Sequence, residues 1–357
     1  MADHTYIYSV IAFKAANHDG GKYWLNLFIK AYDYYSKQYP TAISETENFA
    51  EAVADRTGGE TWLATYIKAH DFYKQHYPTS ISDTKSFAQT TADRENGAGW
   101  LEVYIAAHNY YKSQYPSAIS DTKRFAEAAA DRSNGAVWLD VYMKAHNYYK
   151  SQYSSDISGT KRFAEITAER ANGATWLEVY IKAHDYYKSQ YSSDISGTKS
   201  FAKLTADRAN GATWLEVYIK AHDYYKSQYS SDISGTKSFA KLTADRANGA
   251  AWLEVYIKAH DYYKNQYPSD ISGTKRFATM TADLTNGAVW LAVYIEAHDF
   301  HKTLFPGFIS ERKRFATETA SRDDAATWFE QFKMNFATCE ATTRTDRSQF
   351  DCALDRT

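Results

Sequence analysis

Seven histidines recur at one position of a repeated pattern. They lie 38 residues apart: His70, His108, His146, His184, His222, His260 and His298. Histidine binds metal ions and transfers protons near neutral pH. Equivalent atoms in adjacent helical repeats, however, are separated by about 10 Å, whereas two ligands of one metal ion both lie roughly 2 Å from it. We therefore predict buried, neutral histidines hydrogen-bonded to tyrosine hydroxyls, with Tyr187 a candidate partner of His184, and no metal site.

A row of arginines follows the same period. It consists of Arg56, Arg94, Arg132, Arg170, Arg208, Arg246 and Arg322. Leu284 occupies the equivalent place in the seventh repeat, so a neutral side chain is tolerated there. We expect the aliphatic part of each arginine to pack on aromatic rings, with its guanidinium group on the last-turn carbonyls or on an acidic neighbour. We favour this interpretation over a row of ligand-binding groups.

A polar strip on the first helix of each repeat is the best candidate binding surface. In three central repeats the strip consists of Glu178, Lys182, Asp185 and Tyr186; of Glu216, Lys220, Asp223 and Tyr224; and of Glu254, Lys258, Asp261 and Tyr262. Charges at i and i+4 usually form only a solvated helix surface. Because the same four groups recur at a regular step, we expect them to bind an extended protein or peptide.

Motifs of known catalytic chemistry do not occur in the sequence. It has no glycine-rich phosphate loop, no nucleophile elbow and no H-E-x-x-H pattern. An enzyme also needs one site, whereas repeats supply several similar environments. We therefore predict a non-catalytic scaffold without a cofactor or a metal ion. Two alternatives stay open: a structural protein that associates with itself, and recognition of glycans by tyrosines that stack on sugar faces.

The elements that position these groups follow from the tryptophans. All nine lie 38 residues apart without an insertion, and the stretch 176–213 is repeated almost unchanged in 214–251. A unit that keeps its length through every copy stacks on its neighbours. We predict an all-α solenoid: an N-terminal capping helix in residues 1–23, eight 38-residue helix-turn-helix repeats in 24–327, and a capping helix with a polar tail in 328–357.

The first helix of a central repeat is expected to begin at Trp176. Thr175 and Glu178 form a T-x-x-E capping box there, as do the pair Thr213 and Glu216 and the pair Thr327 and Glu330. The helix is expected to end near Tyr191, because other copies place proline after this tyrosine. Helical spacing puts Trp176, Tyr180, His184, Tyr187 and Tyr191 on one buried face.

The second helix is shorter. We expect Asp194 or Ser196 to cap its start and Phe201 to anchor it in the core. It is expected to end at Asn210-Gly211, where the glycine would take the left-handed C-terminal conformation.

The two ends of the chain depart from the repeat. Tyr6, Ile7, Val10, Ile11 and Phe13 suggest an amphipathic stretch that forms half a unit. The last twenty residues read as a polar tail with no repeat character. This tail contains the only two cysteines, Cys339 and Cys352, and their pairing stays open because two thiols alone do not define a redox compartment.

Composition limits the partners. The chain has 41 lysines and arginines against 43 aspartates and glutamates, for a net charge of -2, so the usual electrostatic case for nucleic acid is missing. No apolar run approaches the roughly 20 residues that span a bilayer, and the first residues lack a signal-peptide pattern. We expect a protein without a membrane span, and the compartment stays open.

The predicted architecture resembles the tetratricopeptide class in general design. The unit here is longer, and the tetratricopeptide pattern of Trp, Leu-Gly, Tyr and a closing Pro is not present. No ligand or residue role is therefore carried over from that class.

Overall fold

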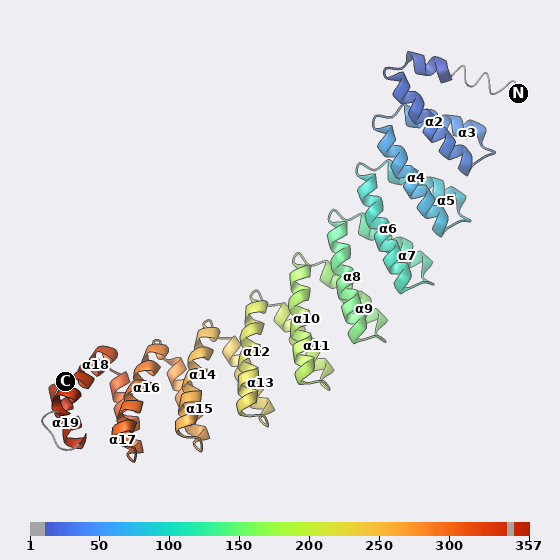
Figure 1. The fold of residues 1–357 in the computed structure, drawn as a ribbon. Helices are drawn as coiled ribbons and strands as arrows, with labels where there is room; N and C mark the ends of the chain where they lie inside the picture. The colour runs from blue at the N-terminus through green and yellow to red at the C-terminus, as the bar shows by residue number, and fades with distance from the viewer. Residues whose placement is uncertain (1–10, 341–345) are drawn as a thin grey trace. The chain divides into compact units, whose positions relative to one another are not determined.

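A computed structural model describes residues 11–340 and 346–357, and within these ranges it contains helices joined by turns and no strand. The chain divides into two compact units, Met1–Leu177 and Glu178–Thr357. Each repeat contributes a long first helix, here called the A helix, and a shorter second helix, the B helix (Figure 1). The predicted all-α repeat solenoid is confirmed.

The described part of the first unit starts in a helical segment that includes residues 11–17. Its A helices are α2 (Gly21–Gln38), α4 (Gly59–His76), α6 (Gly97–Gln114) and α8 (Gly135–Gln152). Its B helices are α3 (Ile43–Ala54), α5 (Ile81–Ala92), α7 (Ile119–Ala130) and α9 (Ile157–Ala168). The boundary between the units falls inside the next A helix, α10 (Gly173–Gln190).

The second unit continues the alternation. Its further A helices are α12 (Gly211–Gln228), α14 (Gly249–Gln266), α16 (Gly287–Leu304) and α18 (Ala325–Glu340). Its B helices are α11 (Ile195–Ala206), α13 (Ile233–Ala244), α15 (Ile271–Asp283) and α17 (Ile309–Ala320), and the last helix is α19 (Asp346–Arg356).

Within each unit, packing follows one rule. An A helix contacts its own B helix, the B helix of the preceding repeat and the neighbouring A helices, as α6 contacts α7, α5, α4 and α8. The A helices of a unit therefore form one layer, against which the B helices pack. The described part of the chain contains no helix long and apolar enough to cross a membrane.

The start of each A helix differs from the prediction. Helix α12 begins at Gly211, so Thr213 lies inside it, and the capping-box prediction is wrong. Gly211 is not left-handed either, because the described glycines with positive φ are Gly20 and Gly58. A Cβ atom at Gly211 would lie 2.3 Å from the carbonyl oxygen of Thr205. This close approach, and not a left-handed cap, is what requires glycine.

The other helix ends agree with the sequence, except that α11 stops at Ala206, before the predicted end at Asn210-Gly211, and residues 207–210 form the turn to the next A helix. Asp194 accepts a hydrogen bond of 2.8 Å from the backbone N–H of Gly197, so Asp194 rather than Ser196 caps α11. The A helices that precede a proline stop two residues before it, as α4 stops at His76 before Pro78. The tyrosine between them is the C-terminal cap.

The core is built from rings. In the second unit, Trp214 stacks on Tyr218 at 5.2 Å, and Tyr218 stacks on His222 at 5.9 Å, along one face of α12. Phe201 of the preceding B helix lies 4.9 Å from Tyr218. Offset aromatic contacts of this kind add stability beyond the burial of apolar area. The predicted buried face and the anchoring role of the phenylalanine are confirmed.

The N-terminal segment acts as half a repeat, as expected. His18 stacks on Trp24 at 5.5 Å and lies 3.2 Å from Asp55. His18 thus occupies the position that arginine has in later repeats. Within the predicted amphipathic stretch, Tyr6, Ile7 and Val10 lie outside the described residues. Ile11 packs on the core, but Phe13 is 71% exposed, so its predicted place on the apolar face is wrong.

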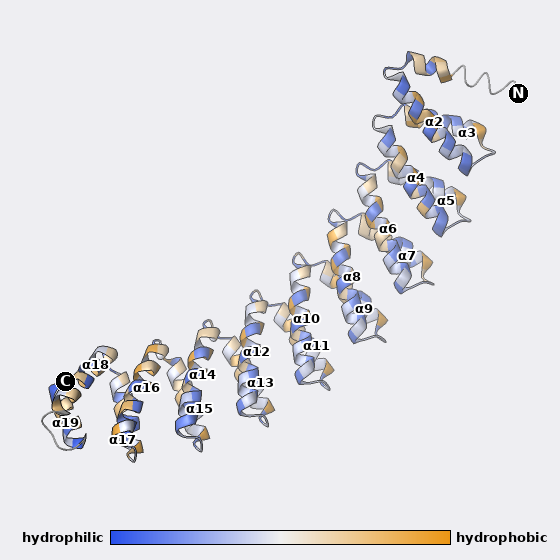
Figure 2. Cartoon of the chain, viewed as in Figure 1, coloured by the Kyte–Doolittle hydropathy of each residue, from blue (hydrophilic) through white to orange (hydrophobic). Residues whose placement is uncertain are grey.

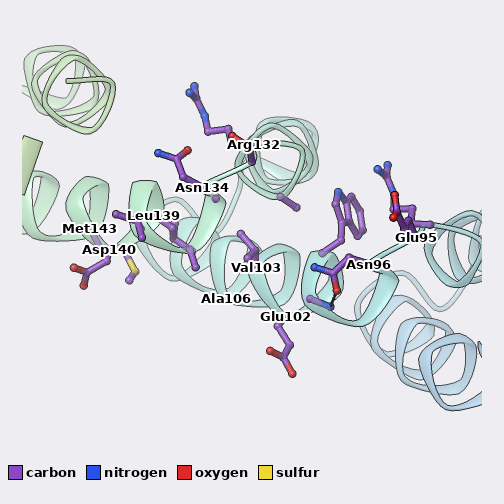
Figure 3. A pocket seen from close by; sticks show the side chains of 18 residues that line it. Glu95, Asn96, Glu102, Val103, Ala106, Arg132, Asn134, Leu139, Asp140 and Met143 are labelled. Carbon is purple, nitrogen blue, oxygen red and sulfur yellow. Dashed lines mark hydrogen bonds between the residues drawn. The ribbon is translucent and has the colours of Figure 1, made fainter. Parts of the chain in front are cut away.

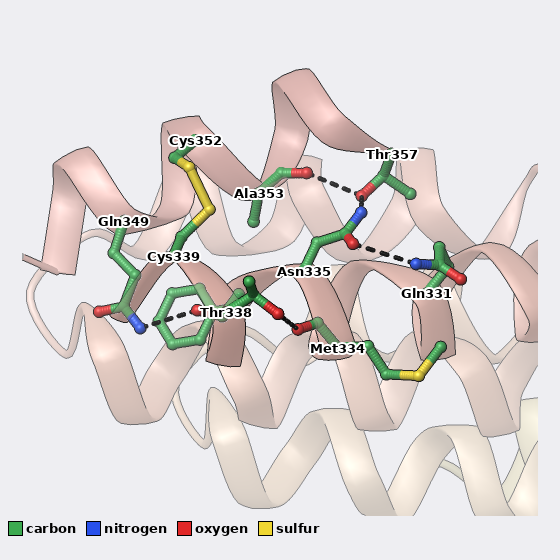
Figure 4. Close-up of a disulfide and its surroundings, with 10 residues drawn as sticks. Gln331, Met334, Asn335, Thr338, Cys339, Gln349, Cys352, Ala353 and Thr357 are labelled. Atoms are coloured by element: carbon green, nitrogen blue, oxygen red, sulfur yellow. Dashed lines mark hydrogen bonds between the residues drawn. A yellow bond between two sulfur atoms is a disulfide. The ribbon is translucent and has the colours of Figure 1, made fainter. Parts of the chain in front are cut away.

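The C-terminal segment, predicted as a polar tail with no repeat character, contains a helix that packs on the last repeat. From Asp346 onwards it forms α19, which a Cys339–Cys352 disulfide joins to α18 (Figure 4). Phe350 of α19 packs on Phe305 and Phe315. Arg347 forms an ion pair of 2.7 Å with Glu311. Helix α19 thus covers the aromatic end of the last repeat.

Candidate functional site

The histidine row is structural. In the second unit His260 is fully buried, and both ring nitrogens meet tyrosines of the preceding A helix: Nδ1 lies 2.7 Å from the Tyr224 hydroxyl, and Nε2 lies 2.7 Å from the Tyr229 hydroxyl. Tyr224 donates to Asp261 at 2.6 Å, so its oxygen accepts from the Nδ1–H of His260. Nε2 then accepts from Tyr229. This network satisfies a neutral histidine completely.

The same clamp recurs at other histidines. It holds His70, His146, His222 and His298 through tyrosine pairs from the preceding repeat. The suggested partner Tyr187 is wrong, because its hydroxyl instead donates to Asp194 at 3.3 Å. Burial lowers the pKa of these histidines, to about 4 for His146, as predicted. The described residues contain no group of three or more metal-ligating side chains.

One clamp is incomplete. Phe72 stands where other repeats have the first tyrosine, and the Nδ1 atom of His108 is buried without a hydrogen-bond partner. Its Nε2 atom keeps the second tyrosine, Tyr77, at 2.7 Å. The His76 ring packs 4.6 Å from that of His108. Burial is the main cause that lowers the pKa of His108 to about 4.

The arginine row also holds repeats together. Arg94 lies 4.2 Å above the Trp100 ring, and its guanidinium is 3.2 Å from Asp131 of the next repeat. Asp131 also accepts from the Trp100 indole N–H at 2.8 Å. The predicted packing on aromatic rings with an acidic partner is confirmed. Leu284 interrupts the row, and Trp290 then donates to Ser321 in place of an aspartate.

The candidate strip is only partly open to a partner. In the second unit, Glu216, Lys220, Glu254 and Lys258 are exposed and form no ion pair with a described residue. Glu178, Lys182 and Asp185 are exposed as well. Tyr186, Tyr224 and Tyr262 are half-buried, however, and each hydroxyl bonds the histidine and the aspartate of the next repeat. Asp223 and Asp261 are therefore already hydrogen-bonded, which leaves the glutamates and lysines.

A groove of about 850 Å³ lies between α6 and α8 in the first unit (Figure 3). Its apolar lining includes Val103, Val137 and Leu139. Val137 is 65% exposed and stands where two central repeats have Thr175 and Thr213. Figure 3 shows Glu102 and Asp140 on one side of the two helices and Arg132 with Asn134 on the other. An apolar floor between charged rims is typical of a binding site.

Two smaller grooves have related positions. One groove, of about 410 Å³, is lined by the start of α8 and by the turn before α10, and it shares Val137 with the first groove. The other, of about 390 Å³, lies between α16 and α18 in the second unit and is lined by Val289 and Ala292. Ala292 replaces the strip glutamate of the central repeats. Val137 and Val289, which line these grooves, depart from the residues of the most regular repeats, so the choice of the strip in those repeats did not include them.

No family model, curated protein or solved structure matches the chain. The site is therefore defined by its geometry alone.

Proposed function

We propose that the protein is a non-catalytic repeat scaffold that binds an extended protein or peptide partner along the layer of A helices. The observation that supports this most is the groove between α6 and α8, where an exposed valine lies between charged rims. One related groove follows in the same unit, and repeat scaffolds use such extended surfaces for binding. In the second unit, the exposed glutamate and lysine members of the strip supply charge on that unit's own A helices.

The test is selection of peptides from a phage-displayed library of random 12-residue peptides on the immobilised full chain. Selected peptides are then measured against two variants. Val137→Lys places a charge on the groove floor and should weaken binding about tenfold or more. Ile166→Lys is the matched control, because Ile166 is 46% exposed on the B helix α9 and lines none of the described grooves. Failure to select any peptide, or equal binding by both variants, contradicts the proposal.

Self-association is a second candidate function, because one apolar row is exposed. The isoleucine that begins each B helix is present in all eight repeats and is between 51% and 61% exposed, and Figure 2 shows the start of the B helices as hydrophobic. These residues are Ile43, Ile81, Ile119, Ile157, Ile195, Ile233, Ile271 and Ile309. A second copy of this chain exposes the same isoleucines at the same 38-residue spacing. Exposed apolar groups arranged in this way favour association.

Light scattering over a hundredfold concentration range tests this candidate. A mass that rises above 40.7 kDa with concentration, and returns to it in the Ile119→Glu/Ile157→Glu variant, supports self-association. A constant mass at the monomer value rules it out. Glycan binding is not proposed, because the hydroxyls of the candidate tyrosines are used inside the fold.

A further inference from the structure

The groove between α6 and α8 lacks a lysine that most repeats possess. Six residues after the tryptophan, the A helices carry Lys30, Lys68, Lys144, Lys182, Lys220 and Lys258. Repeat three has Ala106 at this place, and Ala106 lines the groove. The substitution removes a cation from this part of the surface and shortens the side chain. Both changes open the groove beside Glu102 and Asp140.

Neighbouring repeats show what this lysine does. The Lys68 ammonium lies 3.6 Å from the carboxylate of Glu102 on the next A helix. Lys144 lies 2.8 Å from Asp140, one turn before it on the same helix. The lysine thus neutralises carboxylates along the edge between consecutive A helices. A lysine at residue 106 would face Asp140 as Lys68 faces Glu102.

The groove has one cation fewer than the usual repeat, although Glu102 and Asp140 each keep one exposed lysine partner, Lys68 at 3.6 Å and Lys144 at 2.8 Å. Its two arginines are already paired with carboxylates that do not line it: Arg94 with Asp131 and Arg132 with Glu169, at 3.2 Å and 3.3 Å. Each arginine also lies over a tryptophan ring. Glu95 lines the groove and forms no ion pair with a described residue. A partner therefore meets carboxylates beside an apolar floor.

We infer that this groove binds a peptide segment in which a lysine or arginine stands next to an aliphatic or aromatic residue. The partner's cation occupies the place of the missing lysine above Ala106, between Glu102 and Asp140, and the apolar side chain packs on Val137 and Leu139. Complementary charge at a half-exposed rim mainly selects the partner and speeds its association. This inference rests on the proposed peptide-binding function and adds the chemistry of the partner.

The test uses the full chain and the same phage-displayed 12-residue library. Peptides selected on the wild type should carry lysine or arginine beside an apolar residue. Fluorescence anisotropy then compares the best labelled peptide with a version in which glutamine replaces its basic residues. The change Ala106→Lys restores the usual residue of the repeat and should weaken the basic peptide about tenfold or more. Ala128→Lys, on the exposed face of α7, is the matched control and should have no effect.

The outcomes separate this inference from the function on which it rests. If peptides are selected but lack basic residues, or bind Ala106→Lys as well as wild type, the basic-partner inference is overturned while peptide binding stands. If the wild type selects no peptide, the proposed function and the inference both fail. A Glu102→Gln variant adds a second readout, because it should weaken the basic peptide and reduce the dependence of its affinity on salt.

Discussion

Replacing Tyr224 by phenylalanine tests the clamp that joins the repeats. The change keeps the ring and removes one hydroxyl, which accepts from the Nδ1–H of buried His260 and donates to Asp261 at 2.6 Å. Asp261 is about half exposed and can bond water instead. The Nδ1–H of His260 is closed to water because the ring is fully buried, and it keeps only a long contact of 3.4 Å to the Asp261 carboxylate, so this donor becomes poorly satisfied. Leaving one buried donor unsatisfied costs about 1–3 kcal/mol.

The natural chain already contains a similar change. Phe72 takes the tyrosine's place before His108, and there Nδ1 has no partner. The structure therefore predicts that Tyr224→Phe makes the clamp of His260 resemble the incomplete clamp of His108, with the long Asp261 contact in place of Asn109 as the remaining difference. Because the phenylalanine ring fits at this position, the cost comes from the missing hydrogen bond and not from a cavity.

Amide hydrogen exchange is the suitable assay, since long repeat arrays do not unfold in one step. A cost of about 1–3 kcal/mol corresponds to roughly 5- to 150-fold faster opening, because every 1.4 kcal/mol is a factor of ten. The increase should be confined to amides of α12 and α14, which carry the two partners.

The control is Tyr23→Phe. Tyr23 is 54% exposed, and its hydroxyl bonds no described residue, so exchange should not change. Equal exchange in Tyr224→Phe and Tyr23→Phe would refute the conclusion that the clamp stabilises the interface between repeats.

Three further predictions concern other parts of the chain. Burial lowers the pKa of His146 from 6.5 to about 4, so between these pH values the unfolded chain binds more protons than the folded chain. The stability of the fold should therefore be complete above pH 6.5 and fall as the pH is lowered towards 4. A melting temperature that stays constant from pH 7.5 to 5 would contradict this. Glu169 pairs with Arg132 and leaves the Trp138 indole N–H buried without a partner. The change Glu169→Asp should supply the acceptor found in other repeats and raise the stability of the first unit by about 0.5–1.5 kcal/mol in denaturation experiments. An unchanged denaturation midpoint would count against this role of the aspartate. The Cys339–Cys352 disulfide closes a loop and stabilises the fold by about 3 kcal/mol. After reduction, proteolysis of α19 should become faster while the first unit stays intact. Equal proteolysis with and without reductant would show that the disulfide does not hold this helix.

Much of the fold could be read from spacing. A 38-residue period without insertions places Trp214, Tyr218 and His222 on one face of a helix, and the structure stacks them there. The burial of the histidines and the lowering of their pKa followed from the same periodicity. Arginine on tryptophan was also predictable, because Arg and Trp keep a fixed separation in sequence.

The candidate site was less accessible to sequence reasoning. The strip was chosen in the most regular repeats, where Tyr224 turned out to be used inside the fold. The groove depends on Ala106 and Val137, two departures from the repeat that lie on different helices. Their effect on the surface appears only when both helices are placed side by side. Comparing each repeat with the consensus at exposed positions would have drawn attention to them.

By itself the sequence determined the repeat length, the helix pairs and the buried face, because these depend on the order of residues along one helix and on the need to bury apolar rings. The tertiary structure decided which tyrosines meet each histidine, where the A helices begin and which surface is hollow. The partners of His260 lie 31 and 36 residues before it, on another helix. Such contacts depend on the relative placement of two helices, and the pattern within one helix contains no information about it.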